Sequence, residues 1–375
     1  MWSDTPLYVK ATVKLLLLAL IVLTAVMARE FLIPFTIAVF FTFLLLPVSR
    51  KLMQWKFPRT LAIVTSIVLA AAVFVGLLYF FYTQVANFSD DWPELQQKLG
   101  EKWDAIQQYI SREFHITRRA QGKWVDKKLA ELAESGHVYV LGIFSATGAF
   151  LANLALIPIY IFFLTLYKEK FKEFIRLRNV HKNPEEVLNI IARISTVSQK
   201  YLKGILLDVL ILSVLNSTGF LILGLKHAIL FGVLASILNI IPYVGVLIGS
   251  ILPVIMAILT KDAFSYALGA ALVCWVVQLI DNNFVTPYVV GSSVSINPFT
   301  AVVVLILGAL IWGVPGMILC IPITGMIKVI CDNVEALKPY AFLMGEEKNF
   351  NERRAKNSAL WKRVKRKKVK TEPPK

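Results

Sequence analysis

A short polar run near residue 280 holds the side chains of this sequence best suited to bind a proton or a cation. It contains one acid, Asp281, placed among amides and ended by a proline: Gln278, Asn282, Asn283 and Pro287. A carboxylate at the centre of a membrane helix costs about 2.5–3.5 kcal/mol on insertion scales, so membrane acids usually face a cavity and serve a function. We expect Asp281 to bind a proton or a cation beside these amides. The alternative is a solvated or helix-capping cluster at the membrane interface.

A second acid, Asp208, lies within the apolar stretch 206–210. Lys203 is near helical reach, so an interfacial salt bridge between the two is the favoured interpretation. A second ligand for a coupling ion is the alternative. The histidines and cysteines are scattered, and neither set has the spacing of a metal site or a disulfide framework. No metal site is therefore expected.

These residues lie near two long apolar segments that are broken in the middle. Residues 228–260 are interrupted at 239–245, and residues 297–330 at 312–316, by proline and glycine. Each half is shorter than the roughly 20 residues that cross a bilayer as a helix. Broken membrane helices survive only where they are buried in protein or line a watery cavity, and a pair of them is the best sequence pointer to a transporter's binding site. The breaks add these candidates: Asn239, Pro242, Tyr243, Gly245, Asn297, Gly313 and Gly316.

The composition agrees with a membrane protein. The chain has 375 residues, 57% of them hydrophobic, and a mean hydropathy of +0.65, which is more apolar than a soluble domain can bury. The net charge of +16 is uneven, since residues 346–375 contain 12 Lys and Arg against 4 Asp and Glu. A basic tail favours contact with anionic lipid headgroups on the cytoplasmic side. Nucleic-acid binding is disfavoured, because no accompanying fold motif is present.

The hydropathy pattern predicts an all-α polytopic fold with six full spans and two oppositely oriented helical hairpins. The spans are expected at 12–28, 31–48, 60–82, 138–166, 204–225 and 263–285. Five regions follow from this pattern: 1–83 with three spans, 84–137 as a polar helical domain, 138–203 with the fourth span and a connector, 204–335 as a transport core, and 336–375 as the basic tail.

Both polar regions carry helical patterns. Within 84–137, apolar residues recur every three or four positions, and the charges nearly balance at 8 Lys and Arg against 9 Asp and Glu. In the connector, Asn183-Pro184-Glu185-Glu186 reads as an N-cap, a first-turn proline and first-turn acids. An apolar stripe follows, so this helix is expected to lie on the membrane surface and lead into the fifth span.

The basic residues of the short loops set the orientation. Lysine and arginine gather at 50–59 and at 168–182, which predicts that both loops are cytoplasmic. Both termini are then cytoplasmic, the region 84–137 is extracytoplasmic, and the two broken segments enter from opposite sides. Re-entrant hairpins and pairs of short spans both satisfy this path.

The sequence lacks the motifs of the common catalytic classes. No nucleophile elbow, phosphate loop, zinc motif or haem motif is found. We expect no enzyme activity and no cofactor, and an ion or solute gradient rather than ATP as the energy source.

Three stretches resemble the autoinducer-2 exporter family of bacterial and archaeal permeases. They are 238–245 with Gly249, 281–291, and a third set made up of Asn297-Pro298, Gly308, Trp312-Gly313, Gly316 and Ile321-Pro322. The order of spans and polar regions also matches. The resemblance implies a homo-oligomer, with a pentamer as one option, in the inner membrane. It also implies export of the small polar signal autoinducer-2 or sodium(lithium)/proton antiport, since members of both kinds are known.

The chain departs from the family pattern at two positions. Val246 stands where a second proline often follows the turn, and Asn297 where many relatives place histidine. Either change could alter the choice of substrate or coupling ion. The leading hypothesis is a secondary transporter that exports a small polar organic solute, with autoinducer-2 as the first candidate. The alternatives are a sodium(lithium)/proton antiporter and a non-transporting scaffold whose region 84–137 binds a partner.

Overall fold

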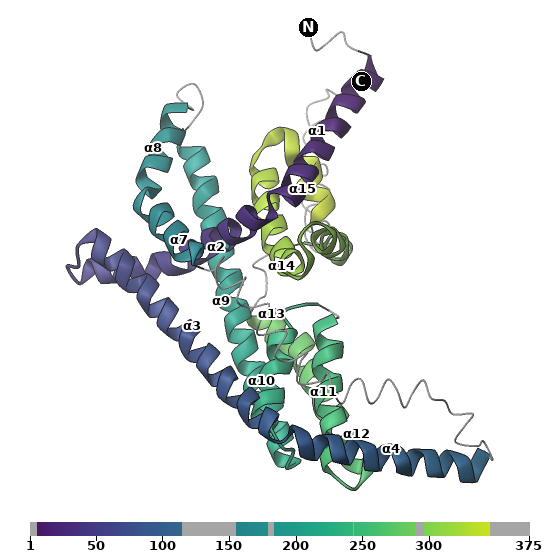
Figure 1. The fold of residues 1–375 in the computed structure, drawn as a ribbon. Coiled ribbons are helices and arrows are strands. Elements are labelled where there is room, and N and C mark those ends of the chain that lie inside the picture. The colour runs from purple at the N-terminus through teal and green to yellow at the C-terminus, as the bar shows by residue number, and fades with distance from the viewer. Residues whose placement is uncertain (1–5, 115–154, 179–183, 243, 290–295, 346–375) are drawn as a thin grey trace, which may run out of the picture. The chain divides into compact units, whose positions relative to one another are not determined.

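The computed structural model describes residues 6–114, 155–178, 184–242, 244–289 and 296–345. Within these ranges the regular elements are helices, which confirms the predicted all-α fold, and one isolated β-bridge joins Ile296 to Gly345. The helices are α1 (Leu7–Met27), α2 (Arg29–Gln54), α3 (Arg59–Asp90), α4 (Trp92–Phe114), α7 (Leu156–Leu166), α8 (Lys168–Arg178), α9 (Pro184–Ile222), α10 (Ala228–Leu238), α11 (Val244–Thr260), α12 (Phe264–Ile280), the π-helical η1 (Asp281–Val285), α13 (Thr286–Val289), α14 (Pro298–Asn333), the 3-10 helix η3 (Glu335–Leu337) and α15 (Lys338–Met344) (Figure 1).

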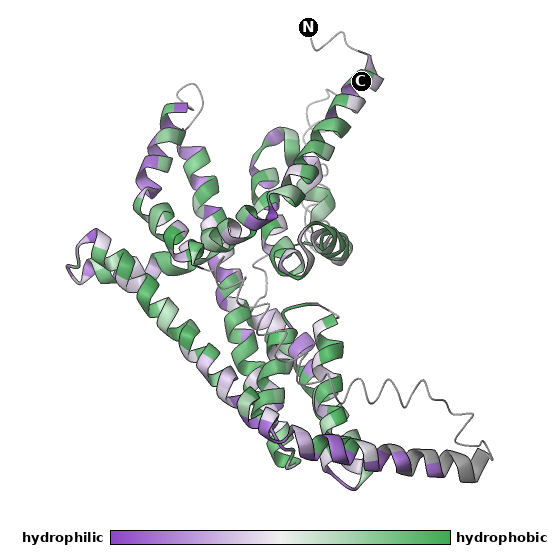
Figure 2. Cartoon of the chain, in the orientation of Figure 1, coloured by the Kyte–Doolittle hydropathy of each residue, from purple (hydrophilic) through white to green (hydrophobic). Residues whose placement is uncertain are grey.

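Six stretches of the described chain are long and apolar enough to cross a bilayer. They are α1, α2, α3, α9, the region 264–289 and α14, and their ribbons are largely in hydrophobic colours in Figure 2. α7, α10 and α11 are apolar but shorter than the roughly 20 residues that a span needs. The expected span at 138–166 is described only from residue 155 onward. The chain is therefore a multi-pass membrane protein.

The chain divides into two compact units. Unit 1 comprises residues 1–29, 169–201 and 291–375, and unit 2 comprises 30–168 and 202–290. The first broken segment and the polar run around Asp281 belong to unit 2, whereas the second broken segment belongs to unit 1.

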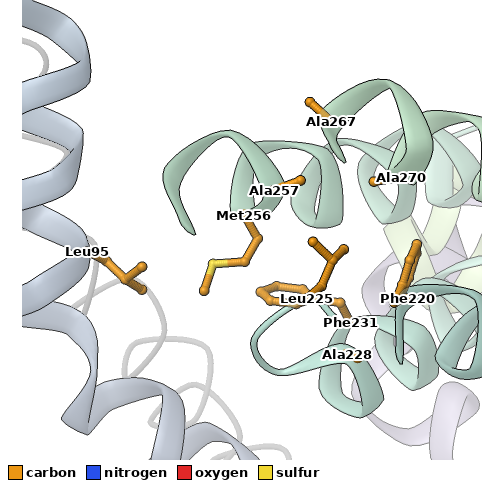
Figure 3. Close-up of a cluster of buried hydrophobic side chains, with 9 residues drawn as sticks. All are labelled: Leu95, Phe220, Leu225, Ala228, Phe231, Met256, Ala257, Ala267 and Ala270. Atoms are coloured by element: carbon orange, nitrogen blue, oxygen red, sulfur yellow. The ribbon is translucent and has the colours of Figure 1, made fainter. Parts of the chain in front are cut away.

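The core of unit 2 forms where α4 and the end of α9 meet α10, α11 and α12. Its buried members are Leu95, Phe220, Leu225, Ala228, Phe231, Met256, Ala257, Ala267 and Ala270 (Figure 3). Alanines on α11 and α12 allow these helices to approach closely, and Leu95 points from α4 toward Met256. The amphipathic pattern predicted within residues 84–137 therefore corresponds in part to α4. The first turn of α4 buries Leu95 in the core of unit 2.

The first broken segment is a hairpin of two short helices. α10 ends at Leu238, α11 begins at Val244, and the two pack against each other. A Cβ atom added at Gly249 would lie 2.9 Å from the Cα of Ala235, so the absence of a side chain permits the close approach. The added Cβ at Gly245 would collide with the carbonyl of Leu238. Gly249 therefore serves close helix packing and Gly245 the turn, and a binding role for Gly245 stays a prediction.

The second broken segment also folds back on itself. α14 contains one non-helical residue, Gly313, with φ 64° and ψ −138°, a backbone conformation open almost only to glycine. Gly308 and Gly316, on either side of this kink, meet closely, since a Cβ at Gly308 would lie 2.6 Å from the carbonyl oxygen of Gly316. Beside the kink, Trp312 Nε1 donates a hydrogen bond to the carbonyl of Ala25 in α1 at 2.9 Å.

Candidate functional site

The end of α12 departs from α-helical geometry at Asp281. Residues Asp281–Val285 form a π-helical turn, in which the backbone N–H of Thr286 bonds to the carbonyl of Asp281. Such turns are rare and frequently mark functional sites. The Asp281 side chain is only 3% exposed. A buried acid therefore lies at the start of an irregular turn in an apolar helix.

Three side chains donate hydrogen bonds to the Asp281 carboxylate. Asn239 Nδ2 lies 2.9 Å from Oδ2, and Gln278 Nε2 lies 3.2 Å from the same oxygen. Thr286 Oγ1 lies 2.7 Å from Oδ1. A buried charge is tolerated only where hydrogen bonds or a counter-charge replace water, and each hydrogen bond to a charged group contributes about 1.5–3 kcal/mol. This cradle can hold a carboxylate that binds and releases a proton or a cation.

The hydrogen bond that spans the longest stretch of chain in this cradle comes from the break between α10 and α11. Asn239 is the first residue after α10, so the turn that interrupts the membrane segment delivers an amide to an acid 42 residues further along the chain. Pro242 lies in the same turn and is half-buried. Tyr243 lies outside the described residues. Any movement of this turn would change the hydrogen bonding of Asp281.

Asp208 is a second buried acid and lies on α9. It is 9% exposed, and its Oδ1 has no hydrogen-bond partner among the described residues. The favoured interpretation of a salt bridge with Lys203 is wrong, because Lys203 is exposed and no ion pair between the two is found in the described chain. Helical proximity in sequence suggested the lysine, whereas the fold buries Asp208 and leaves Lys203 exposed.

A small cavity between α9, α10, α11 and α12 is lined by two of the residues that donate hydrogen bonds to Asp281. Its polar lining consists of Asn216, Asn239, Ser250, Cys274 and Gln278. The cavity volume is about 20 Å³, which suffices for a water-sized occupant but not for an organic molecule. Asn239 and Gln278 line the cavity and also bond to Asp281, so an occupant would contact the same amides as the carboxylate. Among the described residues, no cluster of three His, Cys, Asp or Glu suited to a metal ion is found.

The other members of the polar run face away from this site. Asn282 is exposed and accepts a hydrogen bond from Gln278 at 3.2 Å, while Asn283 is exposed and donates to the carbonyl of Leu279. Pro287 is exposed in α13. Of the predicted run, the structure thus brings together Gln278 and Asp281, and a binding role for the remaining three stays a prediction.

The predicted residues of the second broken segment lie in unit 1. Asn297 caps α14, because its Oδ1 accepts from the backbone N–H of Thr300 at 2.8 Å. Its Nδ2 donates to the carbonyls of Leu343 and Gly345, so its side chain already has partners at both ends. Gly313 forms the kink and Gly316 the close contact described above. Binding roles for these three residues stay a prediction.

Thr286 is a site residue that the sequence pattern did not single out. It follows Asp281 by five positions, a spacing that an α-helix does not bring face to face. The π-helical turn closes an i to i+5 hydrogen bond, which brings Thr286 back over Asp281. The only signal in the sequence is a threonine directly before Pro287.

These features define a class of protein: a polytopic membrane protein with a broken helical hairpin bonded to a buried acid. A match to the model of the AI-2E family transporters covers residues 15–336. The chain belongs to this family of membrane transporters.

The chain is also similar to individual proteins along most of its length. YueF of Bacillus subtilis (strain 168) is 27% identical over 81% of this chain and 84% of the relative. YrrI of the same strain is 25% identical over 80% of this chain and 85% of the relative. The AI-2 transport protein TqsA of Escherichia coli (strain K12) is 20% identical over 90% of this chain and 96% of the relative.

Proposed function

We propose that this chain is a secondary transporter that exports a small polar organic solute and uses an ion gradient, with Asp281 as the site of the coupling proton or cation. The observation that carries the proposal is the hydrogen bond from Asn239 to Asp281. It joins the break of the first hairpin to a buried acid, so movement of the hairpin and occupancy of the acid depend on each other. Such dependence is what coupling between a gate and an ion requires.

Autoinducer-2 is the first candidate for the solute. The family match and the similarity to TqsA support it. The neutral amides and hydroxyl that line the cavity suit a polar, uncharged solute. Since the cavity now admits only a water-sized occupant, the transported molecule would enter after the α10–α11 hairpin moves away from α9 and α12.

A sodium(lithium)/proton antiporter is the second candidate. Two observations favour it: the small cavity, which suits a dehydrated ion better than an organic solute, and the second buried carboxyl, Asp208. An essential pair of membrane acids would distinguish this function from solute export.

The proposed setting is the inner membrane, with both termini cytoplasmic and several copies of the chain in one assembly. Two contacts in unit 2 support the path of the chain. Arg59 at the start of α3 donates to the carbonyl of Leu166 at the end of α7, which are both expected on the cytoplasmic side. Lys226 before α10 bonds to Glu94 of α4 at 3.1 Å, which are both expected outside. The basic tail, proposed to contact anionic headgroups, lies outside the described residues.

The direct test is the outside-to-inside ratio of autoinducer-2 in cells that lack their own exporter and express this chain. We expect the ratio to rise and to collapse when a protonophore is added. An unchanged ratio, with the protein shown to be in the membrane, would exclude autoinducer-2 as the transported solute. Sodium- or lithium-dependent proton flux in proteoliposomes would then support the antiporter.

A further inference from the structure

The cavity between α9, α10, α11 and α12 is lined by polar side chains whose donors are already used. Asn216 Nδ2 donates to Ser236 Oγ at 3.2 Å, and the hydroxyl of Ser236 donates to the carbonyl of Gly232. Because Ser236 Oγ can then only accept at this contact, the NH₂ end of Asn216 is turned to Ser236. In the described chain no donor reaches the carbonyl end of Asn216, which is left for the cavity that this buried residue lines.

Asn239 and Gln278 line the same cavity with their NH₂ groups engaged elsewhere. Both donate to the Asp281 carboxylate, and Gln278 Nε2 also donates to Asn282 Oδ1. An ionised carboxylate only accepts hydrogen bonds, so these contacts fix which end of each amide is the NH₂ group. Among the described residues no donor reaches either amide oxygen, and both are available to an occupant of the cavity.

Ser250 adds a fourth oxygen to the lining. Its hydroxyl donates to the carbonyl of Val246 one turn earlier in α11, so that Oγ can only accept from an occupant. Cys274 completes the polar lining with no more than a weak S–H donor. The cavity of about 20 Å³ therefore offers acceptors almost alone, and a single water molecule could donate to only half of the four oxygens.

The charge of Asp281 favours a cation as the occupant. Asp281 is 3% exposed and has no ion-pair partner in the described part of the chain, and a buried charge without a counter-charge is costly. Asp281 does not line the cavity itself, whereas Asn239 and Gln278 both line it and bond to the carboxylate. A hydrogen bond to a carboxylate polarises an amide, which makes its carbonyl oxygen a stronger ligand for a cation.

We propose that this cavity binds a small alkali cation, sodium or lithium, through neutral oxygens, while Asp281 supplies the counter-charge through two of the amides. The ligand oxygens are those of Asn216, Asn239, Gln278 and Ser250. Carbonyl oxygens can replace the hydration shell of a monovalent cation. Calcium takes about six to eight oxygen ligands and magnesium keeps several waters, for which the cavity has no room. The role of the ion in transport rests on the proposed function, and its binding can be measured without transport.

Binding of radioactive sodium to the purified full-length protein tests the site. We expect saturable binding that unlabelled lithium displaces and choline does not. Ser250→Ala removes one ligand oxygen without a change of charge and should weaken the binding roughly 10- to 100-fold. Its control is Ser213→Ala, a half-buried serine of α9 that does not line the cavity. Asp281→Asn should abolish the binding, whereas Asp262→Asn, at an exposed acid of the α11–α12 connection, should not change it.

Absence of saturable sodium binding to the folded wild type, or equal binding by Ser250→Ala and Ser213→Ala, would overturn the proposal and leave water as the occupant. Binding retained in Asp281→Asn would overturn the counter-charge. If Asp281→Asn does not fold, Ser250→Ala keeps the test decisive, because it changes neither the charge nor the hydrogen bonds of Asp281. Sodium binding without any ion or solute flux would retain the site and reject the proposed function, whereas flux without sodium binding would do the reverse.

Discussion

Asn239 Nδ2 lies 2.9 Å from Asp281 Oδ2, and this contact joins the interrupted hairpin to the acid at the end of α12. Asn239 is the C-cap of α10, and its backbone N–H bonds to the carbonyl of Ala235 at 3.0 Å. It is the last residue before the turn, so a movement of the turn would shift its amide by unwinding only this end of α10. In the proposed transport cycle, the contact would link the conformation of the hairpin to the state of the buried acid.

Substitution of Asn239 by leucine tests this link. The variant keeps the branching of the side chain but removes the donor to Asp281, at a loss of about 1.5–3 kcal/mol for a hydrogen bond to a charged group. We expect coupled flux in proteoliposomes to fall roughly 10- to 100-fold. The matched control is Asn283→Leu, because Asn283 is exposed and bonds only to the carbonyl of Leu279. Equal flux in the two variants would contradict a coupling role for Asn239.

The packing of α10 against α9 gives a second prediction. A methyl group at Gly232 would lie 2.7 Å from the Cα of Ser217, a backbone atom that no side-chain rotation can move. We expect Gly232→Ala to lower the free energy of unfolding by about 1–3 kcal/mol, as overpacking does, and to lower the melting temperature of the detergent-solubilised protein. Gly76→Ala in α3 is the control, since nothing lies within 4 Å of the added methyl. A melting temperature of Gly232→Ala no lower than that of the control would show that the helices pack more loosely than described.

A charged cluster outside the membrane spans predicts a dependence of stability on pH. Lys226 Nζ lies 3.0 Å from Asp91 and 3.1 Å from Glu94, and His227 also contacts Asp91 at 2.8 Å. A hydrogen bond from Lys226 lowers the pKa of Asp91 below its ordinary value of 3.8. Hydrogen bonds from Lys98 and then Lys226 lower the pKa of Glu94 below its ordinary value of 4.5. The two acids in turn raise the pKa of Lys226 above 10.5.

The sign follows from these directions. An acid with a lowered pKa stabilises the fold at pH values above its ordinary pKa, and this stabilisation is lost as the pH falls through the lowered pKa. A lysine with a raised pKa stabilises the fold at pH values below its ordinary pKa, and this stabilisation is lost as the pH rises through the raised pKa. We expect Lys226→Gln to lower the melting temperature by a constant amount between about pH 5 and 9, and by less below about pH 4. The control Lys200→Gln changes an exposed lysine of α9 and should show no such pattern. A difference that grows on acidification would contradict the described pairing.

Much of the architecture could be predicted because its signals are local. The two breaks follow from proline and glycine within apolar segments, and the start of α9 at Pro184 follows from its cap and first-turn acids. Asp281 was identifiable as an acid within apolar sequence. Asn239 was identifiable as a polar residue at a break, where freed backbone groups gather.

The pairing within the site could not be predicted, because it depends on tertiary contacts. Asn239 and Asp281 are 42 residues apart in sequence, and for Asp208 the nearby Lys203 offered a local partner that the fold does not use. Thr286 reaches Asp281 only because the helix widens into a π-turn. Asn297 looked like a ligand by its place before a proline, yet its side chain caps α14 and bonds to the carbonyls of Leu343 and Gly345.

The most direct measurement of the central claim is proton movement in proteoliposomes that contain the wild type or Asp281→Asn. A pH-sensitive dye inside the vesicles reports the response to autoinducer-2, sodium or lithium added outside, and Asp262→Asn serves as the control. We predict a proton response to at least one of these additions for the wild type and the control, and none for Asp281→Asn. A wild-type response retained in Asp281→Asn would contradict Asp281 as the coupling site.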